Sequence, residues 1–129
     1  MMSVNLDGSF YVTSSFVPGM VERRWGRVIN VSACLGRLTG PGPGGGLAPY
    51  RVSKAAMNAM TRNLNSELRS GAGGVLVDAM CPNHCRTDMG GPDAPRSAEQ
   101  GADTIVWLAT RPDDSPTGLL WEDREVVPW

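Results

Sequence analysis

Tyr50 and Lys54 are the two residues of this 129-residue sequence whose types and spacing could carry out acid–base chemistry. They stand four positions apart, so on a helix the phenol and the ammonium would share one face about a turn apart. A phenol with a pKa of about 10 is a poor base at neutral pH, and a nearby cation favours its ionised form. The half-exposed start of an ordinary amphipathic helix has the same spacing, so the surrounding sequence must decide between the two interpretations.

Three helices are predicted around this pair. Apolar spacing predicts one helix from Asn5 to Glu22, bent or ended by Pro18, and a second from Tyr50 to Leu68, stopped by Gly71. Ser97 and Gln100 have the form of a capping box that opens a third helix, which Pro112 closes. The Gly- and Pro-rich stretch "LGRLTGPGPGGGLAP" before Tyr50 lacks a phosphate-binding pattern and predicts a surface loop.

Strands are predicted between these helices. Short β-branched and apolar runs indicate buried strands from Arg27 to Ser32 and from Val75 to Pro82, and the patch Leu119-Leu120-Trp121 indicates a last short one. Helix and strand alternate as they do in a parallel sheet with crossover helices. The predicted fold class is therefore α/β, with one domain spanning residues 1–129.

Composition excludes several classes of function. The net charge is −1, from 12 basic and 13 acidic residues without a basic block, so nothing recruits nucleic acid or a charged membrane surface. No apolar run approaches the roughly 18 residues of a membrane-spanning helix, and no export signal opens the sequence. We expect a cytoplasmic protein with a hydrophobic share, 41%, that suits a globular chain.

The three cysteines indicate free thiols rather than a disulfide framework, because the count is odd and no export signal is present. Cys81, His84 and Cys85 place three possible metal ligands within five residues. A zinc site usually needs a second ligand pair at a distance, and here only Cys34 remains. We expect no metal site.

Four segments in order resemble successive blocks of the short-chain dehydrogenase/reductase family: "VNLDGSF", "GRVINVSACLG", "YRVSKAAMNAMTR" and "CPNHCRTDMGG". The resemblance covers nearly the whole chain and corresponds to the second half of the family's Rossmann-type, doubly wound parallel sheet. The run "RTDMGGPDAPRSAEQGADTIVWLAT" is most similar to the carbonyl-reductase branch. The resemblance implies reduction of a ketone or aldehyde, or oxidation of an alcohol, with NAD or NADP as cofactor and NADP favoured by the branch.

The resemblance also implies roles for individual residues. Tyr50 would give or take the proton, while Lys54 would favour the phenolate and bind the nicotinamide ribose. Asn5 would hold a water that links Lys54 to solvent, although capping or packing would explain it equally well. Three residues after the second strand would contact the nicotinamide: Pro82, Cys85 through its backbone, and Thr87, which is also a suitable turn residue.

Two positions depart from the family pattern. The family's second serine after "NV" donates a hydrogen bond to the substrate carbonyl, and Ala33 stands there without a donor. Ser32 could replace it only if the strand has already ended, because adjacent strand residues point to opposite faces. Asn83 replaces the usual glycine after Pro82, and asparagine tolerates positive φ better than most residues.

The family's Gly-rich turn, which binds the cofactor pyrophosphate, has no counterpart in the chain, and neither do its first strands. We therefore expect a truncated reading frame or a fragment that is weak or inactive alone, with an exposed hydrophobic edge strand. The alternative is a non-catalytic family remnant that acts only in association. The sequence leaves the oligomeric state open, and the resemblance implies that any homo-oligomer would pair through the helices beginning near Asn5 and Tyr50.

Overall fold

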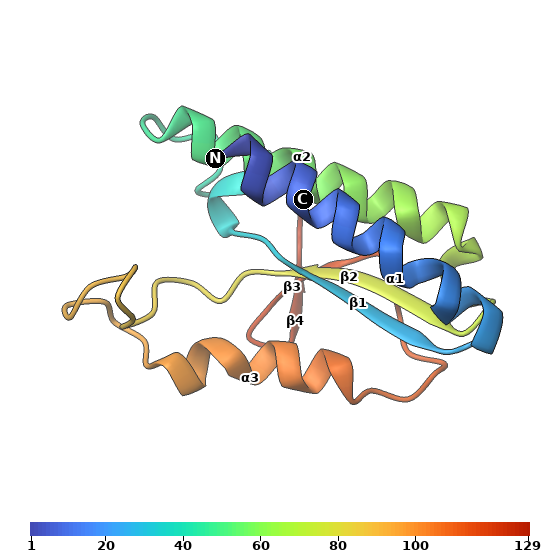
Figure 1. Cartoon of the computed structure of the whole chain (residues 1–129). Helices are drawn as coiled ribbons and strands as arrows, with labels where there is room; N and C mark the ends of the chain where they lie inside the picture. Colours follow the sequence, from blue (N-terminus) through green and yellow to red (C-terminus); the bar gives the residue numbers. More distant parts are fainter.

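The computed structural model describes all residues, 1–129, and consists of three helices and one four-stranded sheet (Figure 1). A π-helical turn, Ser3–Gly8, runs directly into α1, Ser9–Arg23. The other helices are α2, Ala48–Glu67, and α3, Ala98–Ala109. The strands are β1, Gly26–Val31, β2, Val75–Met80, β3, Leu120–Glu122, and β4, Glu125–Val127. Short 3₁₀ turns at Cys34–Gly36 and Arg69–Gly71 follow β1 and α2.

The sheet order is β1-β2-β3-β4, and the first three strands are parallel. Helices α1 and α2 lie on one face of the sheet and α3 lies on the other (Figure 1). This arrangement confirms the predicted α/β fold of doubly wound type. The prediction of a wholly parallel sheet was incomplete, because β4 pairs antiparallel with β3.

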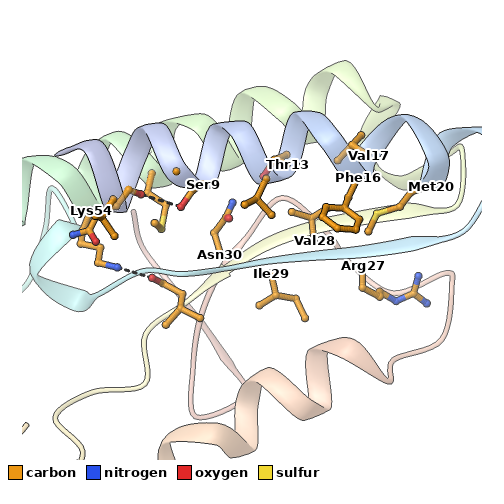
Figure 2. Close-up of a pocket in the computed structure, with 16 residues that line it drawn as sticks. Ser9, Thr13, Phe16, Val17, Met20, Arg27, Val28, Ile29, Asn30 and Lys54 are labelled. Atoms are coloured by element: carbon orange, nitrogen blue, oxygen red, sulfur yellow. Dashed lines mark hydrogen bonds between the residues drawn. The ribbon is translucent and has the colours of Figure 1, made fainter. Parts of the chain in front are cut away.

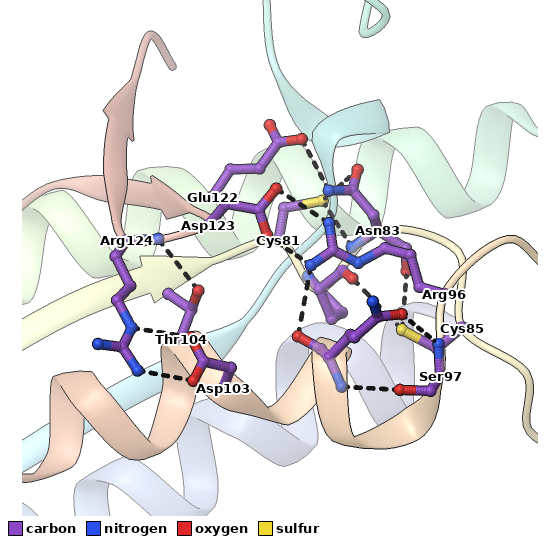
Figure 3. Close-up of polar contacts among 12 residues, drawn as sticks. Cys81, Asn83, Cys85, Arg96, Ser97, Asp103, Thr104, Glu122, Asp123 and Arg124 are labelled. Carbon is purple, nitrogen blue, oxygen red and sulfur yellow. Dashed lines mark hydrogen bonds and ion pairs between the residues drawn. The ribbon is translucent and has the colours of Figure 1, made fainter.

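The β3–β4 hairpin turns through Asp123 and Arg124, which have φ values of 49° and 62°. Two consecutive residues with positive φ are the signature of the tight hairpin turn that asparagine and glycine usually supply. Here side chains hold the turn instead. Asp123 pairs with Arg96, Arg124 pairs with Asp103, and the Arg124 N–H donates to Thr104 Oγ1 at 3.1 Å (Figure 3).

The core lies on both faces of β2, whose six residues are all buried. Its one charged residue, Asp78, accepts hydrogen bonds from Arg111, from the Trp121 indole and from the Leu119 N–H. These contacts satisfy a carboxylate that would otherwise be costly to bury. They also tie β2 to the segment that leads into β3.

Helix α1 continues through Pro18 and ends at Arg23, and the next residue, Arg24, adopts the left-handed conformation with φ of 57°. Of the two effects expected of Pro18, bending or ending the helix, the structure excludes the ending, and the predicted extent to Glu22 is confirmed. A proline inside a helix leaves the carbonyl four residues earlier without its partner. Both Pro18 and Ser14 are exposed, so water can satisfy that carbonyl on the outer side of the helix.

The edge of β1 away from β2 has no neighbouring strand. Gly26 and Ser32 donate their N–H groups towards β2, to the Gly74 and Met80 carbonyls. Backbone direction alternates along a strand, so Arg27, Ile29 and Val31 direct theirs to the free edge. An open, mainly apolar groove of about 580 Å³ runs between this edge and α1, from Lys54 at one end to Met20 at the other (Figure 2). None of the helices combines the length and the apolar character that crossing a bilayer requires.

Candidate active site

The first turns of α2 carry Tyr50 and Lys54 to the carboxyl ends of β1 and β2. Leu47 precedes the helix in the left-handed conformation, with φ of 55°, and Pro49 occupies its first turn. The helix start packs closely on the turn after β1, because a Cβ on Gly36 would lie 2.7 Å from the Lys54 backbone. The helix and strand ends therefore meet where a parallel α/β sheet usually binds its ligands.

The Lys54 ammonium donates a hydrogen bond of 2.7 Å to the carbonyl oxygen of Val31, the last residue of β1 (Figure 2). Its nitrogen lies 5.9 Å from the centre of the Tyr50 ring. Burial lowers the pKa of Lys54, and the Cys81 thiolate partly opposes that effect.

The Tyr50 phenol is half-buried, and its pKa lies above its ordinary value. Burial is the larger cause, because it penalises the charged phenolate, and the nearby sulfurs of Cys81 and Cys34 add unfavourable negative charge. We expected Lys54 to make this phenol more acidic. That expectation was wrong for the chain as it stands, since burial and the two thiols raise the pKa and the Lys54 ammonium donates to the Val31 carbonyl.

Asn5 lies in the π-helical turn and lines the same groove as Lys54. Its Nδ2 donates to Ser53 Oγ at 3.0 Å, and Ser53 Oγ donates in turn to the Tyr50 carbonyl at 2.7 Å. These two hydrogen bonds connect the π-helical turn to the first turn of α2. The amide of Asn5 packs the two helices together, and its role in holding a water for Lys54 stays a prediction.

Ser32 and Ala33 leave β1 in an extended conformation, with Ala33 at φ −154° and ψ 149°. Ser32 is buried, and its hydroxyl donates to the Asn58 side chain on α2. This contact commits the Ser32 hydroxyl to the packing of α2 on β1. The side chain of Ala33 points to the opposite side of the extended backbone from that of Ser32. It is buried and has no hydrogen-bond donor.

The segment after β2 begins with Cys81, Pro82 and Asn83, and Asn83 has φ of 61°. The expectation that asparagine would preserve this turn is therefore confirmed. Cys85 forms a short parallel bridge with Arg96, which brings the loop back towards the start of α3 (Figure 3). Thr87 is exposed, and its Oγ1 accepts the Gly90 N–H at 3.0 Å, so it supports a turn. Contacts of Pro82, Cys85 and Thr87 with a nicotinamide stay predictions.

Four further polar residues gather at the carboxyl ends of the parallel strands, and the sequence analysis did not group them: Cys34, Cys81, Asn83 and Glu122. Asn83 Nδ2 donates to Glu122 Oε1 at 2.7 Å, and the Cys34 thiol donates to Glu122 Oε2 at 3.1 Å. Glu122 ends β3, and Cys34 and Cys81 follow β1 and β2. Their shared position at the carboxyl ends of three parallel strands was the sequence signal that could have grouped them. No group of three or more His, Cys, Asp or Glu side chains is arranged to hold a metal ion.

A parallel sheet with helices on both faces, and a Tyr–Lys pair on the helix that crosses between β1 and β2, defines a Rossmann-type α/β protein. The chain belongs to the short chain dehydrogenase family, whose profile matches residues 1–98.

Relatives in this family include carbonyl reductase 1 (NADPH) of Sus scrofa, which is 43% identical over 84 residues, or 62% of this chain and 29% of that protein. The C-signal of Myxococcus xanthus is 38% identical over 129 residues, which cover 98% of this chain and 75% of that protein. The match thus spans under a third of the carbonyl reductase and three-quarters of the C-signal.

Solved structures share the fold. Carbonyl reductase Sniffer of D. melanogaster superposes with a TM-score of 0.86 at 24% identity, over 99% of this chain and 55% of that one. A short chain dehydrogenase/reductase family protein gives 0.77 at 27% identity, over 94% and 53%. The NADPH-bound carbonyl reductase from chicken fatty liver gives 0.79 at 22% identity, over 99% and 55%.

Proposed function

We propose that this protein is an NAD(P)-dependent oxidoreductase that reduces a ketone or aldehyde, with Tyr50 delivering a proton to the carbonyl oxygen. The observation that carries the proposal is the position of Tyr50 and Lys54. They lie one helical turn apart on α2, at the carboxyl ends of β1 and β2, in a chain of the short chain dehydrogenase family. The carbonyl reductases among its relatives support the substrate class.

The residues present suit the nicotinamide end of a dinucleotide. Lys54 and Tyr50 offer a cation and a phenol for the nicotinamide ribose, and Pro82, Cys85 and Thr87 follow the end of β2 where the ring would lie. NADP is favoured over NAD because the carbonyl reductases among the relatives are described as NADPH enzymes. The bound cofactor would supply the hydride. Nothing in the chain stands as a Gly-rich turn between a strand and a helix to hold the pyrophosphate.

The state of Tyr50 suits the reducing direction. Its raised pKa keeps the phenol protonated at neutral pH, which is the form that donates a proton to a developing alkoxide. Lys54 contributes a positive charge about a turn away and is fixed by Val31. Asn5 positions this region through Ser53 rather than by touching the substrate.

The substrate carbonyl would lack one donor, because Ala33 stands at the position that the family resemblance assigns to a serine. Losing one such donor typically costs about 10²–10³ in rate. Ala33 and the exposed edge of β1 favour the second candidate, a non-catalytic family member that acts by association. The apolar side chains exposed on α1, among them Phe10, Tyr11 and Phe16, support self-association through α1 and α2.

The test is turnover of the purified chain with millimolar NADPH and a panel of aromatic ketones, quinones and aldehydes, followed by the loss of NADPH absorbance. We expect slow turnover that Tyr50→Phe abolishes and that Ala33→Ser raises by about 10²-fold. Tyr11→Phe, on the exposed outer side of α1, is the matched control. Turnover that survives Tyr50→Phe would overturn the proposal, and no turnover in wild type or Ala33→Ser would establish the non-catalytic candidate.

A further inference from the structure

Two thiols meet at the carboxyl ends of β1 and β2. Cys34 opens the 3₁₀ turn after β1, and Cys81 directly follows β2. The backbone N–H of Cys34 donates to the sulfur of Cys81 at 2.9 Å. Both residues are buried, with exposed fractions of 9% for Cys34 and 4% for Cys81.

The surroundings of Cys81 favour its thiolate. Its sulfur accepts the N–H of Cys34 at 2.9 Å and the N–H of Asn83 at 3.4 Å. Donors aimed at a sulfur stabilise the anion. The hydrogen bond from the Cys34 thiol, followed by these backbone donors, lowers the pKa of Cys81 to about 7 against the opposing effects of burial and Glu122.

The surroundings of Cys34 differ from those of Cys81, because the Cys34 thiol donates its proton to a carboxylate. Its thiol donates to Glu122 Oε2 at 3.1 Å, and Asn83 fixes the other carboxylate oxygen at 2.7 Å. The hydrogen bonds to Cys81 and Glu122, together with burial, raise the pKa of Cys34. One sulfur is thus prepared as a nucleophile, and the other retains a proton that a neighbouring carboxylate can accept.

We propose that Cys34 and Cys81 are a redox modification site that closes to an intramolecular disulfide when the protein meets a hydroperoxide. In the first step the Cys81 thiolate attacks one peroxide oxygen. An S–O bond forms, the O–O bond breaks, and the leaving oxygen takes up a proton.

In the second step Cys34 passes its proton towards Glu122 and attacks the Cys81 sulfur. An S–S bond forms, the S–O bond breaks, and the hydroxyl leaves as water with that proton. Over both steps two thiols and one hydroperoxide give a disulfide, an alcohol or water, and a water. The thiols lose two electrons and the peroxide gains them. A dithiol reductant reverses the modification.

The structure selects this pair over the third cysteine. The Cys85 sulfur donates to the Pro82 carbonyl at 3.3 Å and packs against Gly101 at the start of α3. Its sulfur therefore makes its contacts with Pro82 and α3, whereas the Cys81 sulfur accepts from the Cys34 N–H. Burial of Cys34 and Cys81 admits a molecule the size of hydrogen peroxide more readily than a bulky thiol, which favours the internal disulfide over a mixed one.

The experiment is peptide mapping of the folded protein after a hydrogen peroxide titration, followed by blocking of free thiols and trypsin digestion without reductant. Cleavage after arginine places Cys34 in the peptide 28–37 and both Cys81 and Cys85 in the peptide 70–86. The Cys85→Ser variant removes that ambiguity, so a link between these two peptides then identifies the Cys34–Cys81 bond. Dithiothreitol should release both peptides.

In the wild type, the thiols that react after denaturation should fall from three to one before any cysteine is oxidised to sulfinic acid. In Cys34→Ala and Cys81→Ala, neither the pair nor this loss should form, and Cys81→Ala should consume peroxide at least tenfold more slowly. Far-ultraviolet circular dichroism establishes that each variant is folded. A bond that involves Cys85, a link between two molecules, or sulfinic acid formed without a disulfide would each overturn the proposal.

Discussion

The Lys54 ammonium lies 2.7 Å from the Val31 carbonyl oxygen, at the free edge of β1. This contact satisfies one of the edge carbonyls that would otherwise face solvent. It also holds the ammonium on the strand, 5.9 Å from the centre of the Tyr50 ring. Burial and the neighbouring thiols raise the pKa of the phenol, and Lys54 is not among the causes.

The first prediction concerns the ionisation of Tyr50. The phenolate absorbance lost in Tyr50→Phe should titrate above the ordinary tyrosine value of 10.0, because burial and the thiols Cys81 and Cys34 raise the pKa. The measurement is a spectrophotometric pH titration of wild type and variant. The only other tyrosine is Tyr11, so Tyr11→Phe isolates the Tyr50 signal directly. A midpoint below 10.0 would mean that Lys54 controls the phenol after all.

The second prediction concerns the stability of the fold. Asp78→Ala should lower the free energy of unfolding by about 3–5 kcal/mol, because it leaves the Arg111 guanidinium buried without its carboxylate. Asp103→Ala is the matched control, since its ion pair with Arg124 is half-exposed on both sides and screened by solvent, so its loss should be far smaller. Urea unfolding of both variants measures the difference. Equal losses would show that the Asp78 network contributes no more than a surface pair.

The elements that local chemistry determines could be predicted from the sequence. Ser97 and Gln100 form the capping box that their spacing indicates, and α3 begins at the next residue, Ala98. The effect of Pro18 on the first helix was left open by the sequence, because the cost of a proline depends on whether solvent reaches the freed carbonyl. The β3–β4 turn was missed for a related reason. Asp123 and Arg124 adopt positive φ through contacts with residues of the preceding loop and α3.

In the candidate site, too, the local geometry could be predicted from the sequence and the long-range contacts could not. Tyr50 and Lys54 lie on one face because a helix fixes positions four apart, and that geometry is local. Glu122 reaches Cys34 and Asn83 only because three parallel strands end at one edge, across 88 and 39 positions of sequence. The state of Tyr50 was predicted with the wrong sign, since burial and the thiols are contributed by the tertiary fold.

The third prediction concerns the cofactor. We expect the isolated chain to bind NADPH and NADH too weakly for saturation at millimolar concentration, because it offers contacts to the nicotinamide end but no Gly-rich turn for the pyrophosphate. Isothermal titration calorimetry of the wild type measures this. Lys54→Met is the control, since it removes the cation proposed to contact the ribose. Saturable binding in the micromolar range that Lys54→Met weakens would contradict the prediction.

The fourth prediction concerns the pH dependence of Cys81. The thiolate absorbance lost in Cys81→Ser should appear with a midpoint at about pH 7, below the ordinary thiol value of 9.0, because the Cys34 thiol and two backbone N–H groups donate to the sulfur. Cys34→Ala keeps the backbone donor and removes the thiol donor, so the midpoint should move up. The folded-state pKa lies below the unfolded one. Cys81 therefore contributes stability that is fully present above about pH 9 and is lost as the pH falls through 7. Equal midpoints in the two proteins would mean that the Cys34 thiol does not activate Cys81.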